Sequence, residues 1–180
     1  MKREINVFDW ANEITTQLGK GVLLTTKADD KVNSMTIAWG MLGIEWAKPV
    51  FVTLVRKGRF TRELLDKNPE FTINIPYKST NKKAIGFCGS RTGRSIDKIK
   101  EADLTLEEPL EIKVPAIKEY PLTLECKVIY RQEQDANAIS PEDNEKYYPQ
   151  DVDSSNTGAN KDYHILYHAE IVKAYIIEDW

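Results

Sequence analysis

Apolar and polar residues alternate along much of the chain in short runs, with the period of two that is typical of β-strands. The run 71–75 is the plainest, because its three apolar residues are separated by Thr72 and Asn74. The run 50–55 is continuously apolar and rich in valine, which favours a strand buried on both faces. Six such segments predict strands at residues 22–26, 33–40, 50–55, 71–75, 122–130 and 163–177.

Three segments between these strands have the pattern of short helices, at residues 9–18, 61–67 and 95–101. Asp9 and Ser95 are the expected N-caps, because their side-chain oxygens can accept hydrogen bonds from the first free N–H groups of a helix. The middle helix should end at Asn68, since the following Pro69 disfavours helical backbone at the residue before it.

The order of these elements predicts the fold class. Asp29 and Asp30 form a turn signal between the first two strands, which predicts an antiparallel hairpin. Strands and helices do not alternate regularly, so a doubly wound parallel sheet is not expected. The pattern instead predicts a mainly β protein, an antiparallel β-barrel with short helices appended. A length of 180 residues favours one domain over residues 1–180.

Charge is distributed unevenly. The chain has 25 Lys and Arg against 28 Asp and Glu, a net charge of −3. Residues 132–160 hold seven acids and one base, so this segment carries −6 and the remainder carries +3. The segment is also longer than ordinary connections, which favours a lid or a dimer-surface element. Cationic residues gather at 56–62 and 78–100.

Composition excludes several classes of function. The slightly acidic balance argues against nucleic-acid binding and against a basic membrane-surface protein. No apolar run approaches the roughly 20 residues that span a bilayer, and no signal peptide is recognisable, so we expect no membrane partner. Two cysteines, Cys88 and Cys126, predict no disulfide framework, fit a cytoplasmic location and cannot form a four-cysteine metal site. We expect no metal.

Residues 56–61 form the first candidate site, between a buried strand and a helix. Arg56, Arg59 and Thr61 can donate hydrogen bonds to phosphate oxygens, and Gly58 lets a ligand approach the backbone. The alternative is a solvated basic turn.

Residues 88–98 form the second candidate site, in which glycines, hydroxyl residues and arginines precede a helix. This composition suits a backbone nest around an oxyanion, although the P-loop pattern is absent, and a flexible polar loop is the alternative. Cys88 is expected to be a small buried residue, because Ile85 and Phe87 flank it, rather than a reactive thiol.

Residues 33–40 form the third candidate, where Met35 and Trp39 could line a wall for a flat aromatic ligand or simply pack in the core. His164 and His168 fall on a predicted strand and would lie about 13 Å apart, too far to share a metal ion. We therefore interpret them as structural, or as one histidine lining a pocket.

These segments, taken together and in order, resemble the flavin reductase-like family, in particular its flavoredoxin branch. The resembling segments are Asn-Ser-Met-Thr-Ile-Ala-Trp-Gly at 33–40, Lys-Pro-Val-Phe-Val-Thr-Leu-Val-Arg-Lys-Gly-Arg-Phe-Thr at 48–61, Glu-Phe-Thr-Ile-Asn-Ile at 70–75, and Phe-Cys-Gly-Ser-Arg-Thr-Gly-Arg at 87–94, followed by Asp97 and Lys98. The match covers residues 22–100, with weaker echoes at 122–130 and 163–177. Ala169 stands where relatives often have glycine, and segment 132–160 has no counterpart.

The resemblance implies an FMN-binding split β-barrel of Greek-key-like antiparallel strands with short peripheral helices, and a homodimer with the flavin near the interface. It implies that the flavin ring lies along Ser34, Met35, Thr36, Ile37 and Trp39. It places the phosphate near Arg56, Arg59 and Thr61, with Cys88, Gly89, Ser90 and Gly93 completing the pocket and Lys98 nearby. One phosphorylated aromatic ligand would explain all three candidate sites.

The resemblance implies a flavin reductase that oxidises NADH or NADPH as a transient donor. FMN carries this chemistry, so no residue is nominated as a catalytic acid or base. Two alternatives stay open: a flavoredoxin-like carrier that receives electrons from a redox protein partner, and an inactive flavin-binding module. No Gly-x-Gly-x-x-Gly pattern is present, so a nicotinamide would share the flavin pocket.

Overall fold

The computed structural model describes residues 1–77 and 82–178. Its strands are β1 (Lys2–Glu4), β2 (Val22–Ala28), β3 (Lys31–Ile37), β4 (Gly40–Glu45), β5 (Lys48–Arg56), β6 (Glu70–Ile75), β7 (Leu106–Glu107), β8 (Ala116–Ile117), β9 (Leu122–Glu133) and β10 (His164–Ile177). Its helices are α1 (Ala11–Leu18), α2 (Phe60–Lys67), α3 (Lys82–Ser90), α4 (Lys98–Glu101) and α5 (Pro141–Tyr147), with 3-10 turns η1 (Val7–Trp10) and η2 (Ala136–Ala138).

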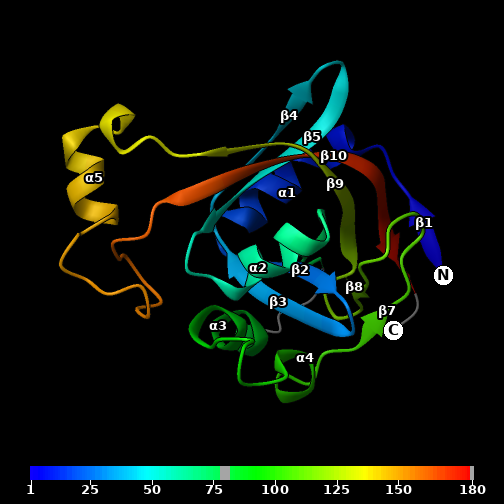
Figure 1. Ribbon diagram of the computed structural model, residues 1–180. Helices are drawn as coiled ribbons and strands as arrows, with labels where there is room; N and C mark the ends of the chain where they lie inside the picture. Colours follow the sequence, from blue (N-terminus) through cyan, green and yellow to red (C-terminus); the bar gives the residue numbers. More distant parts are fainter. Residues whose placement is uncertain (78–81, 179–180) are drawn as a thin grey trace.

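Most strands join one antiparallel sheet in the order β3-β2-β6-β9-β10-β5-β4, and β1 pairs with β10 beside this path. Strands distant in sequence, such as β2 and β6 or β10 and β5, are therefore neighbours (Figure 1). The predicted hairpin of β2 and β3 is confirmed, with its turn at Asp29-Asp30. The prediction of a mainly β, antiparallel protein with short helices is confirmed.

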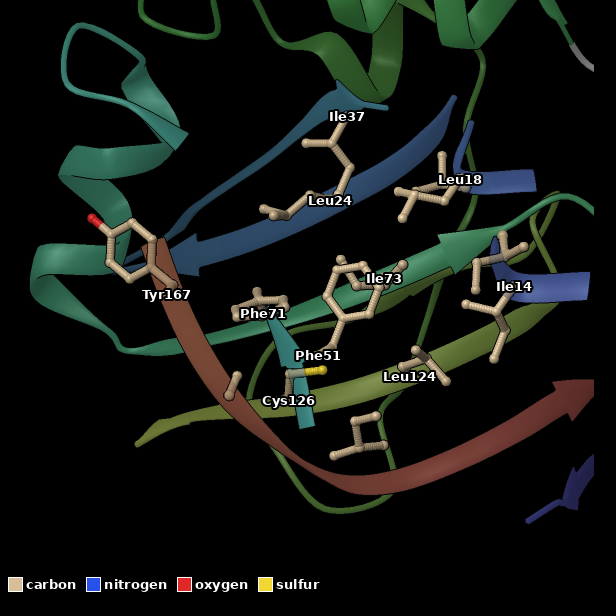
Figure 2. Packing of buried hydrophobic residues seen from close by; sticks show 14 of the residues in the cluster. Ile14, Leu18, Leu24, Ile37, Phe51, Phe71, Ile73, Leu124, Cys126 and Tyr167 are labelled. Atoms are coloured by element: carbon tan, nitrogen blue, oxygen red, sulfur yellow. The ribbon is translucent and has the colours of Figure 1, made fainter. Parts of the chain in front are cut away.

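The sheet curls around a core that α1 helps to fill. Figure 2 shows Ile14 and Leu18 of α1 among side chains from strands that are far apart in the sheet, including Phe51 of β5 and Ile73 of β6. All four side chains are almost fully buried. The run 50–55 is buried on both faces as predicted, apart from the half-buried Leu54. This rigid core fixes β3 and β5, which carry much of the candidate site.

Both predicted N-caps are wrong. Asn6, rather than Asp9, accepts a hydrogen bond from the Phe8 N–H and caps η1, which leads directly into α1. Asp97, rather than Ser95, caps α4 by accepting from the N–H groups of Ile99 and Lys100. In each case a neighbouring side chain with equivalent chemistry sits in the extended backbone that an N-cap requires.

Two elements near the site differ from the sequence-based expectation. The segment 33–40 is not one strand, because β3 ends at Ile37 and β4 begins at Gly40. The segment beginning at Cys88 is not wholly a loop, because α3 continues through Ser90. The acidic segment 132–160 begins on β9 and contains η2 and α5, which stands beside one end of the sheet (Figure 1). None of the described helices is long and apolar enough to cross a bilayer.

Candidate functional site

One cavity of about 890 Å³ opens where β3, β5, the start of α2, the end of α3 and the segment before β10 meet. Twelve of the thirteen residues that the sequence singled out line it: Met35, Thr36, Ile37, Trp39, Arg56, Arg59, Thr61, Cys88, Gly89, Ser90, Gly93 and Lys98. The three segments proposed separately from the sequence therefore meet at one place. Their contact with a flavin stays a prediction.

Ser34 is the exception. Its side chain is fully buried, and its hydroxyl lies 2.7 Å from that of Thr25 on β2, so it does not line the cavity. Its carbonyl oxygen instead accepts a hydrogen bond from the Lys98 ammonium at 3.0 Å. Ser34 therefore contributes to this region through its backbone carbonyl, whereas Met35, Thr36 and Ile37 of the same strand line the cavity.

One wall of the cavity is apolar and aromatic. Met35 and Ile37 come from β3, and Trp39 follows in the connection to β4. The indole of Trp39 meets the ring of Tyr147 edge-on, with centroids 5.1 Å apart, and the imidazole of His164 at 5.3 Å. Thr36 faces α3, where its hydroxyl donates to the Ile85 carbonyl at 2.5 Å. This wall offers a flat ring an apolar surface with aromatic edges beside it.

The cavity lining also includes cationic residues, but its arginines already have partners. Arg56 donates to the carbonyls of Asp162 at 2.6 Å and Tyr147 at 3.0 Å. Arg59 donates through one terminal nitrogen to the Thr157 carbonyl at 2.7 Å. Burial lowers the pKa of both guanidinium groups, which nonetheless stay charged at neutral pH. Both arginines thus fasten segment 147–162 over the cavity.

Arg94 and Lys98 complete the charged lining. Arg94 forms an ion pair with Glu63 at 2.5 Å and donates to the Gly58 carbonyl, which ties the 91–96 loop to α2. The Lys98 ammonium is almost fully buried and donates to the Cys88 carbonyl at 2.9 Å as well as to Ser34. Burial lowers the pKa of Lys98 to about 8. An ammonium has three N–H donors, so Lys98 retains one beyond these two carbonyls.

Cys88 is a buried structural thiol. Only 1% of the residue is exposed, and burial raises the pKa of the thiol above its ordinary value. The interpretation of Cys88 as a small buried residue is confirmed, and a reactive thiolate is not supported. In the described parts of the chain, no three or more of His, Cys, Asp and Glu gather as metal ligands.

Several lining residues were not singled out from the sequence. Segment 132–160, for which the sequence named no site residue, contributes Tyr147, Ser154, Ser155, Thr157, Gly158 and Ala159. The next strand contributes His164, one of the two histidines that the sequence left as structural or pocket-lining. Asn33 lines the cavity beside Gly93; its amide nitrogen donates to the Thr61 hydroxyl at 3.0 Å. Its buried Oδ1 has no partner in the described structure. Asn33 could have been found, because it begins the motif that contains Met35 and Trp39.

The comparisons with known proteins agree on one family. The flavin reductase like domain matches residues 18–179. Flavoredoxin from Methanosarcina acetivorans superimposes with a TM-score of 0.63 at 25% identity, over 88% of this chain and 68% of that protein. An FMN-binding domain of a flavin reductases-like enzyme from Shewanella baltica gives 0.65 at 18% identity, over 98% and 77%.

One curated relative is similar over a shorter stretch. It is an uncharacterized protein of Archaeoglobus fulgidus, 29% identical over 100 residues, which cover 56% of this chain and 55% of the relative. The chain thus spans about half the length of the curated relative that it matches.

Proposed function

Because the chain belongs to the flavin reductase like domain family, we propose that it is an FMN-binding flavoprotein of the flavin reductase type. The observation that carries the proposal is one cavity with an apolar wall at Met35, Ile37 and Trp39 and cations at Arg59 and Lys98. A ligand with a flat ring and a phosphate would place the ring on the apolar wall and the phosphate beside the cations. The solved structures described above support the fold.

Asn33 and Gly93, which both line the cavity, also bear on the fit of FMN. A Cβ atom at position 93 would overlap Asn33 Oδ1, so the glycine makes room for this buried acceptor. That oxygen has no partner in the described structure, and a buried acceptor of this kind is costly unless a ligand satisfies it. A ribityl hydroxyl would supply the missing donor.

Bound FMN would supply the hydride and single-electron chemistry of its ring system. The chain's own residues then have simpler tasks. Trp39 and Met35 shield the ring from water, and Arg59 holds the phosphate with the N–H groups that its bond to Thr157 leaves available. We assign no side chain as a general acid or base.

We also propose NADH or NADPH as a transient electron donor that shares the cavity. A flavoredoxin-like carrier, reduced by a protein donor, is the second candidate, and the 25% identity to a flavoredoxin over 88% of the chain favours it. Stopped-flow mixing of the FMN-loaded protein with NADH and NADPH separates the two. Bleaching of the flavin by either nucleotide supports the reductase. Bleaching by a low-potential redox protein alone supports the carrier, and bleaching by neither supports the inactive module.

We further propose that the chain forms a homodimer in the cytoplasm with the flavin near the interface. The edge strand β4 and the turn after it expose Met41, Ile44 and Trp46, and this strand follows Trp39 of the cavity in the sequence. Both cysteines are unpaired and buried, which suits a reducing compartment.

The direct test of the proposed function is a titration with FMN, followed by flavin fluorescence. We expect saturable binding that Arg59→Ala weakens by about 1–3 kcal/mol, the scale of a lost charge-assisted hydrogen bond. Arg62→Ala is a matched control, because Arg62 lies in the first turn of α2, just after Arg59, but pairs with Asp66. Absence of FMN uptake by the unaltered chain would refute the proposal.

A further inference from the structure

His164, the first residue of β10, forms part of the cavity wall next to Trp39. Only 6% of the residue is exposed. Its Nδ1 lies 2.8 Å from the hydroxyl of Tyr148, and its Nε2 has no hydrogen-bond partner in the described structure. Sequence reasoning left open whether a histidine lines a pocket; His164 does.

The hydrogen bonds that Gln134 accepts determine which ring nitrogen of His164 carries the proton. Gln134 Oε1 receives hydrogen bonds from the backbone N–H of His164 at 2.9 Å and from the hydroxyl of Tyr148 at 2.8 Å. A backbone N–H can only donate, so the amide atom that it meets must be the oxygen. Tyr148 therefore gives its one hydroxyl proton to Gln134. The hydroxyl is left as an acceptor for His164, which must carry its proton on Nδ1.

The same surroundings keep His164 uncharged. Burial, and then the positive charges of Arg56 and Arg59, lower the pKa of His164 to about 3. The phenol of Tyr148 is itself held neutral, because burial raises its pKa. With Nδ1 protonated and the ring neutral, Nε2 presents a lone pair and no proton.

We propose that Gln134 and Tyr148 are positioning residues that hold Nε2 of His164 as a hydrogen-bond acceptor for an N–H or O–H group of the aromatic ligand in the cavity. Neither residue lines the cavity itself, and both belong to the acidic segment 132–160. The segment thus determines that Nε2 of His164, on the cavity wall, accepts a hydrogen bond and does not donate one. A ligand that presents a donor there is favoured, and one that presents a carbonyl or an anion is disfavoured.

The identity of the ligand rests on the proposed function, whereas the tautomer does not, so the two are tested separately. The chain has two histidines, and His168→Gln removes the other one from the spectrum. In nitrogen-15 NMR of that variant without flavin, we expect His164 to be neutral and protonated on Nδ1 between pH 5.5 and 8. Protonation on Nε2, or an imidazolium at pH 7, would overturn the inference.

A matched pair of tyrosine variants tests the positioning role. Tyr148→Phe removes the acceptor of Nδ1–H, so we expect the proton to move to Nε2, the tautomer usual in water. Tyr163→Phe is the control: Tyr163 stacks on Tyr148 with ring centroids 4.8 Å apart, but its hydroxyl donates to Asn144. We expect Tyr163→Phe to leave the His164 signals in place. Unchanged signals in Tyr148→Phe would refute the role of the tyrosine.

Addition of FMN to the labelled protein tests the contact with ligand. We expect the Nε2 resonance of His164 to shift on binding, and Tyr148→Phe to weaken FMN about three- to tenfold, the range for one neutral hydrogen bond. FMN that binds without moving Nε2 would overturn the contact and leave the proposed function intact. A correct tautomer in a protein that takes up no FMN would refute the proposed function instead.

Discussion

Among the glycines that line the cavity, Gly93 leaves the least room for a larger side chain. An added Cβ would overlap Asn33 Oδ1 and lie 3.1 Å from Phe60, so Gly93→Ala must displace the asparagine or the loop. We expect at least a tenfold loss of FMN affinity, measured by fluorescence titration. Gly158→Ala is the control, because Gly158 also lines the cavity but its added Cβ would make only an ordinary contact, 3.7 Å from Asn156. Equal affinities in the two variants would place the ligand away from Gly93.

His164 also predicts how stability depends on pH. The unfolded chain binds a proton at this residue below about pH 6.5, whereas the folded chain does so only near pH 3. The unfolded state therefore holds more protons in this window, and the free energy of unfolding falls as the pH falls. The contribution is about 1.4 kcal/mol per pH unit.

His164→Phe should remove this contribution and keep a ring against Trp39. Urea unfolding at pH 6.5, 5.5 and 4.5 measures it: the stability of the unaltered chain should fall more steeply with acid than that of the variant. Parallel curves would show that His164 is protonated in the folded chain, contrary to its burial beside Arg56 and Arg59.

The position of a single residue, in the core or in the cavity, could be predicted where its type and its neighbours in the sequence determine it. Cys88 could be recognised as buried because apolar residues flank it, and Arg56 and Arg59 as cavity residues because they follow a buried strand. The bonds of those arginines could not be foreseen, because their acceptors are backbone carbonyls about 100 residues away. Every residue has a backbone carbonyl, so the sequence does not indicate which carbonyls accept these hydrogen bonds.

At the scale of elements, α5 holds the aromatic side of the cavity. Ser140 caps this helix: its hydroxyl accepts from the Asp143 N–H at 3.2 Å and lies 2.8 Å from the Asp143 carboxylate. The helix ends at Tyr147, against Trp39, and is followed by Tyr148. The stability of this short helix therefore bears on two contacts with cavity residues. These are the contact of Tyr147 with Trp39 and that of Tyr148 with His164.

Ser140→Ala should destabilise α5 by about 1 kcal/mol, the usual cost of losing an N-cap side chain. We expect faster hydrogen exchange of the amides in residues 141–148 and a few-fold weaker binding of FMN. Ser140→Asp, which keeps a capping oxygen, should restore both properties. Unaltered exchange in Ser140→Ala would mean that contacts with the sheet alone hold the helix.

Strands were predicted better than helices for a physical reason. A strand such as β6 shows its burial as a period of two within a few residues, so the pattern is local. Helix α3 contains Gly86 and Gly89, which indicate a loop, yet position 89 needs a small residue because its added Cβ would lie 3.3 Å from Thr36 on β3. The requirement comes from packing between elements and is invisible in the local pattern.

For the whole molecule, the sheet has one conspicuous free edge. Strand β4 ends the strand order, and it and the following turn expose three apolar side chains, Met41, Ile44 and Trp46. An edge strand with exposed apolar side chains tends to pair or to be covered. A second copy of this chain would cover it around a two-fold axis, in which each edge strand meets its equivalent.

Ile44→Glu tests this arrangement, because Ile44 is 71% exposed and a charge there would be buried between the copies. By light scattering after gel filtration, we expect a dimer for the unaltered chain and a monomer for the variant. Leu106→Glu is the control, since Leu106 is also exposed but lies on β7, away from β4 (Figure 1). If the flavin lies near the interface, Ile44→Glu should also weaken FMN binding, whereas Leu106→Glu should not. A variant that stays dimeric would place the interface elsewhere, and a monomer with full FMN affinity would separate the flavin site from the interface.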